Sequence, residues 1–209
     1  MGRYYPICLS LAGSDCLIVG GGEVACRKAR HLVAAGADVK VVSPHFCDAL
    51  AGLDGVHLVQ RPFEQQDVEG AALVFAATAD AELNSFVARA ARRAGALVNV
   101  VDTPAECDFI VPAMVVRGDL TISISTGSAA PALSRRLRLD LEELLPEAYG
   151  DFAALLGQLR QEVLREVRDT TRRRTILRRL AEKATWDLFA EEGADAVRRL
   201  ARRLVEDES

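Results

Sequence analysis

Residues 17–29 read LIVGGGEVACRKA, and three consecutive glycines in this stretch join a short apolar run to a helix-like run. Gly20, Gly22 and Ala25 follow a G-x-G-x-x-G/A pattern. Between a strand and a helix, the first small residue permits a tight turn, the second lets the backbone approach a pyrophosphate, and the third allows close helix packing. The helix N-terminus would then offer free N–H groups to the phosphates. The stretch leaves two alternatives, a dinucleotide-binding turn or a purely structural turn.

The sequence on both sides of this turn alternates between short apolar runs and helix-like stretches. Near-continuous runs of Val, Ile and Leu are typical of strands in a parallel sheet, because helices cover both of its faces. We therefore predict an α/β fold, with a Rossmann-like, doubly wound parallel sheet. The expected strands are 16–20, 38–43, 56–60, 72–78 and 96–101, and the expected helices are 23–36 and 80–95.

The pattern changes after Asp102. Residues 109–116 and 120–126 flank a polar RGD turn with alternating side chains, which indicates an antiparallel hairpin. A helix is expected after the Thr/Ser/Pro cluster, and amphipathic helices fill the remaining chain. The leucines that recur on one face of the first of these helices are Leu133, Leu137, Leu141 and Leu144. The expected parts are a nucleotide-binding domain over 1–113, a small α+β segment of hairpin plus helix over 114–150, and a helical domain over 151–209.

The composition excludes several classes of protein. Of the 209 residues, 50% are hydrophobic and 27% are charged, which is an ordinary balance for a chain with a buried core. We expect no membrane segment and no signal peptide, hence a cytoplasmic protein. The net charge of −4 argues against a nucleic-acid partner. The five cysteines and three histidines show no ligand spacing, so we expect no resident metal site and interpret the cysteines as small buried hydrophobes.

Two polar residues follow predicted strands at the edge of the sheet where ligands bind. Ser43 stands where the dinucleotide fingerprint has an acidic residue that holds the ribose of NAD. The serine hydroxyl can also form a hydrogen bond to a ribose. Because Ser43 carries no negative charge, NADP remains an alternative cofactor. Asp102 follows the fifth strand. It is either a general base that accepts a proton as hydride leaves, or the first residue of a D-T-P turn that bonds backbone amides.

Four separated motifs, in this order, resemble the precorrin-2 dehydrogenase module of siroheme synthases. They are GGGEVA at 20–25, NVVD at 99–102, FIVPA at 109–113 and ISISTGSAAPALSRRLR at 122–138. The resemblance covers about residues 7–146, and the later helices match only in general character. Several members of the family carry Ser directly before the proline of the helix start, where this chain has Ala130.

The resemblance implies oxidation of precorrin-2 to sirohydrochlorin with NAD, on the way to siroheme, with Asp102 as the catalytic acid/base. It implies a homodimer interlocked through residues 114–150. Some members also insert iron, which leaves ferrochelatase activity and a transient ferrous or cobaltous ion open. The predicted cofactor-binding residues are Gly20, Gly21, Gly22, Glu23, Val24, Ala25, Ser43, Pro44 and Thr78. The predicted substrate-binding residues, which would offer amides and a cation to the eight carboxylates of the macrocycle, are Asn99, Ser125, Thr126, Gly127, Ser128 and Arg135.

Alternatives remain at this stage. The arginines at 135, 136 and 138 also fit a solvated helix face, as does the run at 170–179, where no aromatic residues interleave for base stacking. A similar sheet could serve as a non-catalytic NAD(H) sensor in a dimeric regulator. A chelatase without the redox step is a third reading, which the intact GGGEVA motif disfavours.

Overall fold

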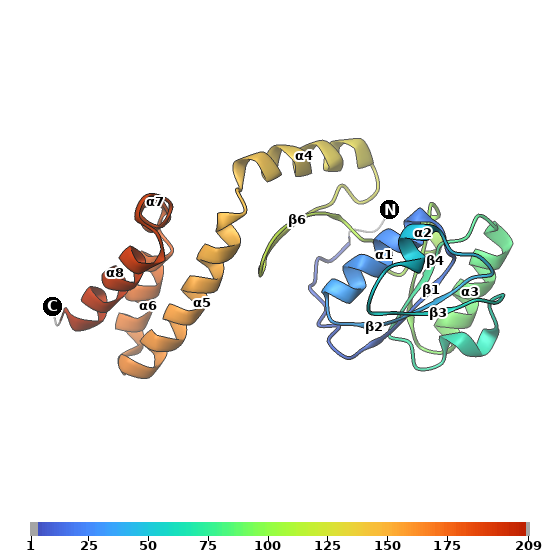
Figure 1. The fold of residues 1–209 in the computed structure, drawn as a ribbon, viewed down its shortest axis with the longest axis horizontal. Helices are drawn as coiled ribbons and strands as arrows, with labels where there is room; N and C mark the ends of the chain where they lie inside the picture. Colours follow the sequence, from blue (N-terminus) through green and yellow to red (C-terminus); the bar gives the residue numbers. More distant parts are fainter. Residues whose placement is uncertain (1–3, 208–209) are drawn as a thin grey trace. The chain divides into compact units, whose positions relative to one another are not determined.

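The computed structural model describes residues 4–207, and Figure 1 shows its helices and strands. The chain divides into two compact units, Met1–Val111 and Pro112–Ser209. The first unit holds a five-stranded parallel sheet in the order β3-β2-β1-β4-β5. This order, with helices between the strands, confirms the predicted doubly wound α/β fold. The strands are β1 (Asp15–Val19), β2 (Asp38–Val42), β3 (Val56–Val59), β4 (Leu73–Ala76) and β5 (Leu97–Val100).

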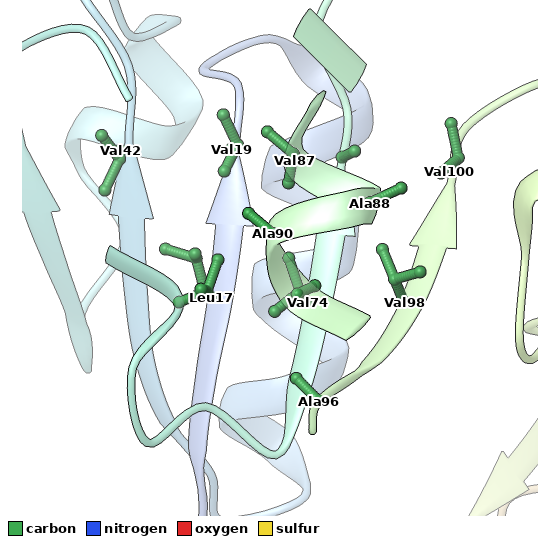
Figure 2. Packing of buried hydrophobic residues seen from close by; sticks show 13 residues of the cluster. Leu17, Val19, Val42, Val74, Val87, Ala88, Ala90, Ala96, Val98 and Val100 are labelled. Carbon is green, nitrogen blue, oxygen red and sulfur yellow. The ribbon is translucent and has the colours of Figure 1, made fainter. Parts of the chain in front are cut away.

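The two faces of this sheet are buried under different helices. On one face, α3 (Ala81–Arg93) packs against a core of valines, and Figure 2 shows Val87 and Ala88 of this helix over the sheet residues. On the other face, α1 (Glu23–Ala34) buries Ala25, Cys26, Ala29 and Leu32. Successive strand residues therefore enter opposite cores, which explains the continuous apolar runs in the sequence. The remaining elements of this unit are α2 (Asp48–Ala51) and the 3₁₀ helices Gln65–Val68 and Pro104–Glu106.

An ion cluster fixes the segment between β3 and β4. Asp67 is buried, and its carboxylate accepts hydrogen bonds from both terminal nitrogens of Arg61 at 2.8 and 2.7 Å and from the Glu64 amide at 2.9 Å. The Lys40 Nζ atom lies 3.5 Å from the same carboxylate. Because each carboxylate oxygen has donors, the buried charge is compensated.

The second unit begins with the antiparallel pair β6 (Ala113–Arg117) and β7 (Leu120–Ile124). Helix α4 (Pro131–Leu144) packs on β6, and the side chain of Arg117 donates to the Glu142 and Leu145 carbonyls at the C-terminal end of α4. These bonds satisfy carbonyls that have no partner within the helix. The remaining helices, which share one apolar core, are α5 (Ala148–Glu166), α6 (Thr170–Leu180), α7 (Lys183–Glu192) and α8 (Ala194–Glu206).

The structure differs from the sequence-based boundaries at one place. The expected break near 150 falls inside α5, and the hairpin and α4 belong to the same compact unit as the later helices. A Cβ atom at Gly150 would lie 2.9 Å from the Arg117 carbonyl carbon, so the first turn of α5 touches the hairpin backbone directly. This close contact leaves no linker at 150. The expected break at 113 lies two residues from the observed one at Val111.

The structure also bears on the predictions about the cysteines and about membrane segments. Cys16 and Cys26 are buried as expected, but Cys8 is exposed, and Cys47 and Cys107 are half-buried. Within residues 4–207, none of the helices is both long and apolar enough to span a bilayer.

Removal of the Asp67 charge tests the ion cluster. We expect Asp67→Asn to lower the free energy of unfolding by about 2 kcal/mol, because Arg61 loses its charged partner. The loss is moderate because one third of the Arg61 side chain is exposed to water. Urea denaturation of both proteins measures this difference. The matched control is Asp187→Asn, which removes an exposed pair with Lys183 and should change stability by less than about 0.5 kcal/mol.

The same pair of proteins tests the pH dependence. The hydrogen bonds from Arg61 hold the pKa of Asp67 below its usual value. A lowered pKa in the folded state stabilises the protein above the unfolded pKa of about 3.9, and this contribution disappears as the pH falls through the folded value. The difference between the wild type and Asp67→Asn should therefore be full at pH 7 and shrink below about pH 4. A difference that stays constant down to pH 2 would contradict this assignment.

Candidate cofactor and substrate site

The first two glycines of the turn after β1 are required by close packing. Gly20 has φ +126°, and a Cβ atom there would lie 2.3 Å from the Ala77 carbonyl oxygen. A Cβ atom at Gly21 would lie 1.9 Å from the His45 carbonyl oxygen. Neither position has room for a side chain. Close packing therefore explains the absence of side chains at these two residues, and their contact with a cofactor stays a prediction.

Gly22 differs from its neighbours because its Cα faces open space. A Cβ atom there would meet nothing within 4 Å, and the backbone is extended with φ −89°. Gly22 is the N-cap of α1. It has no side chain, so the helix receives no side-chain cap at this position. The first intrahelical bond runs from the Cys26 amide to the Gly22 carbonyl at 3.0 Å. The amides of residues 23–25 thus lack intrahelical partners and fit an anionic group such as a pyrophosphate.

Ser43 lies beside the glycine turn at Gly21. Its hydroxyl donates to the His45 carbonyl at 2.7 Å, and its oxygen would lie 2.8 Å from a Cβ atom at Gly21. The Cys47 amide donates to the Gly21 carbonyl at 2.8 Å. The serine proton is therefore used within the protein, and a ribose contact through the remaining lone pair stays a prediction. Pro44 is exposed, and its carbonyl accepts from the Gln60 side chain.

Thr78 follows β4 and is held by a residue that the sequence analysis missed. The Asn84 Oδ1 atom accepts from the Thr78 amide at 3.1 Å and from its hydroxyl at 2.8 Å, and the Asn84 Nδ2 atom donates to the Thr78 carbonyl at 3.0 Å. This network fixes the turn between β4 and α3. The signal for it was a buried polar residue on the apolar face of α3, one turn before Val87 and Ala88.

Asp102 stands two residues after the end of β5 in an unusual backbone conformation. Its φ is +59°, and the Val101 amide before it still pairs with the Ala76 carbonyl at 3.0 Å. Within residues 4–207 the carboxylate of Asp102 accepts no hydrogen bond, whereas Asp80 caps α3 through two amides. The turn-forming alternative for this side chain therefore finds no support in the structure. The carboxylate is exposed at the edge of the sheet where β1 and β4 also end.

Asn99 lies on β5 and is buried. Its Nδ2 atom donates to the Phe109 carbonyl at 3.0 Å, so this amide holds the segment that returns along β5. Lys28 of α1 lies near this segment, with its Nζ atom 5.6 Å from the centre of the Phe75 ring. Burial lowers the pKa of Lys28. A contact between Asn99 and a substrate stays a prediction.

Most of the predicted substrate residues of the second unit, at 125–128, lie in the loop between β7 and α4, and Arg135 lies on α4 itself. Gly127 and Ser128 have φ values of +62° and +68°. The Thr126 hydroxyl accepts from the amide of Ala130, the N-cap residue of α4, at 3.1 Å and lies 3.3 Å from the Ser134 hydroxyl. The Ser125 hydroxyl accepts from the Gly127 amide at 3.1 Å.

The three arginines of α4 differ in their partners. Arg136 pairs with Asp140 at 3.2 Å, and Arg138 pairs with Glu142. In the described part of the chain Arg135 forms no ion pair and is exposed. Arg135 is therefore the member of this group whose charge is available to a ligand.

The arginine run at 170–179 lies on α6, and two of its side chains have partners within the protein. Arg172 donates to the Val205 and Asp207 carbonyls, and Arg173 donates to the Leu164 and Val167 carbonyls. These two side chains therefore satisfy the C-terminal ends of α8 and α5. The other arginines of the run, at 174, 178 and 179, are exposed, as expected for a solvated helix face.

Backbone strain coincides with the predicted site. Asp102 and Ser128 are the two non-glycine residues with positive φ in the described part of the chain. Such conformations are unfavourable for residues with a Cβ atom and collect at functional sites. The sequence pattern predicts both residues to belong to the site, Asp102 in the first unit and Ser128 in the second.

One hollow in the structure lies away from these residues. A pocket of about 370 Å³ is lined by residues at the amino ends of β1 and β2, among them Asp15, Asp38 and Lys40. Ligands of open parallel sheets bind at the opposite, carboxyl edge. Among residues 4–207 no group of three or more His, Cys, Asp or Glu side chains is arranged to hold a metal ion.

Comparisons with known proteins agree with the geometry. Residues 7–113 match the model of a putative NAD(P)-binding family. The chain is similar to siroheme synthases of Thioalkalivibrio sulfidiphilus, at 40% identity over 206 residues, and of Pseudomonas paraeruginosa, at 41% over the same length. These alignments cover 97% of this chain but 42% and 44% of the relatives, so the chain spans less than half of their length. The matches confirm the resemblance that the four sequence motifs indicate.

The fold also has a solved counterpart. The structure of SirC, a precorrin-2 dehydrogenase, superposes with a TM-score of 0.79 over 96% of this chain and 100% of that chain. The sequence identity is 23%, so this likeness concerns the fold alone.

Substitutions in the glycine run separate its structural and binding roles. We expect Gly21→Ala to lower the free energy of unfolding by about 2–3 kcal/mol, because the new methyl group overlaps the His45 carbonyl. Gly22→Asp should fold normally, because Asp is a good N-cap and its Cβ atom enters open space. The added carboxylate would face the free amides and weaken NAD binding roughly 100-fold. Thermal unfolding and calorimetric titration with NAD measure the two effects, and tight NAD binding by Gly22→Asp would contradict the assignment.

Proposed function

The chain belongs to the putative NAD(P)-binding family, and we propose that it oxidises precorrin-2 to sirohydrochlorin with NAD as the hydride acceptor. The observation that carries the proposal is the pairing of an uncapped helix N-terminus after β1 with an unpartnered carboxylate after β5, at one edge of one sheet. The names of the siroheme synthases and of SirC support this choice of substrate.

The cofactor would be held mainly by backbone. The amides of Glu23, Val24 and Ala25 would bind the pyrophosphate, and Gly22 would leave room for it. The bound nicotinamide would supply the hydride acceptor. Ser43 and Pro44 would border the adenosine ribose, and Thr78 would border the cofactor beyond β4. Since Ser43 brings no negative charge, the preference for NAD over NADP is the finer part of this proposal.

Removal of two hydrogens from the macrocycle releases one hydride and one proton. Asp102 would accept the proton, because within residues 4–207 its carboxylate oxygens accept no hydrogen bond and stay available for this step. The substrate carboxylates would bind to Arg135 and to amides of the loop at 125–128 other than that of Gly127, which donates to the Ser125 hydroxyl. A transient ferrous or cobaltous ion would be a second substrate. The reaction is predicted to take place in the cytoplasm.

A homodimer is part of the same proposal. Leu133, Leu137 and Leu144 form one stripe along α4, and each is exposed, Leu144 to 72%. Ser134 of the same helix is buried, and α4 packs on β6. Val116 of β6 is also half-exposed. A stripe of this kind is typical of a protein interface, and a second copy of the segment 114–150 would cover it.

The dimer is tested by a charge on the stripe. We expect Leu137→Glu to convert the protein to a monomer, because a buried carboxylate without a partner would oppose association. Analytical ultracentrifugation measures the mass. Arg136→Glu, one residue away on the solvated side, is the matched control and should leave the mass unchanged. A monomeric wild-type protein at micromolar concentration would exclude this part of the proposal.

The activity is tested with purified protein, precorrin-2 and either NAD or NADP, by following the absorbance of the oxidised macrocycle and of the reduced nicotinamide. We expect oxidation with NAD, and at least a 100-fold lower kcat for Asp102→Asn, which tolerates the same left-handed backbone but is a poor proton acceptor. NAD affinity should be unchanged in this variant. Addition of cobaltous ion to the product then tests metal insertion.

The outcomes separate the remaining readings. Binding of NAD without oxidation of precorrin-2 would favour a nucleotide sensor. Metal insertion without oxidation would favour a chelatase, and normal turnover by Asp102→Asn would remove the proposed base.

A further inference from the structure

The edge strand β5 is covered by the segment that follows it. Edge strands expose N–H and C=O groups that need partners. At Val98 the partner is Asp108, whose side chain accepts from the Val98 amide at 3.0 Å and whose amide donates to the Val98 carbonyl at 2.9 Å. Arg92 holds the Asp108 carboxylate at 3.0 Å. The returning segment thus takes the place of a sixth strand at this position.

At Val100, the next residue whose backbone faces the edge, the partner is a sulfur atom. The Val100 amide donates to Cys107 Sγ at 3.2 Å, and the same sulfur lies 3.1 Å from the Val100 carbonyl oxygen and 3.4 Å from that of Thr103. A thiol has one hydrogen and can accept as well as donate. Cys107 therefore accepts from Val100 and donates to the Val100 or the Thr103 carbonyl. One side chain joins the beginning and the end of the turn at 100–103.

The turn that Cys107 closes contains Asp102. Its own hydrogen bonds are long: the Thr103 amide lies 3.4 Å from the Val100 carbonyl, and the Thr103 hydroxyl lies 3.5 Å from the Val101 carbonyl. These distances exceed the usual range for strong bonds. A residue with a Cβ atom keeps φ +59° only where its surroundings impose it. The Val101 amide donates to the Ala76 carbonyl and the Thr103 carbonyl accepts from the Glu106 amide, each at 3.0 Å. The thiol is the side chain that contacts both ends of the turn, at Val100 and at Thr103.

The state of the thiol agrees with this role. Burial raises the pKa of Cys107, so it keeps its proton at neutral pH and remains a donor. Buried cysteines without such contacts act as small apolar side chains. Cys16 at the amino end of β1 is fully buried in the core and serves as the comparison within this sheet.

We propose that Cys107 is a positioning residue, whose thiol fixes the turn at 100–103 and thereby presents the Asp102 carboxylate at the carboxyl edge of the sheet. The link to turnover rests on the proposed function of Asp102. The link between the thiol and the backbone conformation does not rest on that function, because it concerns Val100, Asp102 and Thr103 alone.

The test compares Cys107→Ala, Cys107→Ser and Cys16→Ala in the full-length chain, under conditions where thermal unfolding shows all three to be folded. In Cys107→Ala we expect amide hydrogen exchange at Val100 to be roughly fivefold to tenfold faster, because the amide loses its acceptor. We expect kcat for precorrin-2 to fall at least tenfold while the Kd for NAD changes less than twofold. Cys107→Ser should recover most of both properties, because a hydroxyl also donates and accepts.

Cys16→Ala removes the same atoms from the opposite end of the sheet. It should lower the unfolding temperature and leave both the exchange at Val100 and kcat unchanged, which separates positioning from general stability. Crystals of Cys107→Ala should show Asp102 away from φ +59°. Wild-type exchange at Val100, an unmoved Asp102, or wild-type kcat in Cys107→Ala overturns the proposal.

A wild-type protein that does not oxidise precorrin-2 would refute the proposed function. In that case the exchange rates and the conformation of Asp102 still decide whether the thiol holds the turn.

Discussion

The structure depends on a point where three backbone segments meet without a side chain between them. The turn after β1 touches the Ala77 carbonyl on one side and the His45 carbonyl on the other, at Gly20 and Gly21. Contacts of this kind tolerate no Cβ atom, and they press the start of α1 against the ends of β2 and β4. The N-terminus of α1 is thereby held at the carboxyl edge of the sheet, and its first amides face outward at Gly22. The packing of the turn and its capacity to bind an anion have the same origin.

The same edge shows how a sheet can satisfy its own polar groups and still leave a reactive one free. The segment after β5 supplies partners to Val98 and Val100 through Asp108 and Cys107. The carboxylate of Asp102, on a strained backbone after Val100, accepts no hydrogen bond in the described part of the chain. Together with the amides of residues 23–25, it is a polar group at this edge that is left available to a ligand.

The second unit uses its charges in a comparable way. Arg117, Arg172 and Arg173 each donate to carbonyls at the C-terminal end of a helix, so these cations are part of the scaffold. Arg136 and Arg138 pair along α4, and in the described part of the chain Arg135 forms no ion pair. The leucine stripe of α4 is the apolar counterpart, since the described chain leaves its side chains exposed. The residues without internal partners are thus those available to a substrate or to a second copy.

The sequence by itself determined the parallel sheet, the strand–turn–helix around the glycines, the hairpin and the place of Asp102, because runs of valine, turn residues and chain order are local signals. It did not distinguish Gly21 from Gly22, although one is blocked by His45 and the other is open. Only the tertiary structure decided that Asn84 holds Thr78, that Cys107 pairs with Val100, and that α5 runs through the expected boundary at 150. These features depend on which atoms of distant segments come within about 3 Å of one another, and the period of a sequence pattern carries no information about such contacts.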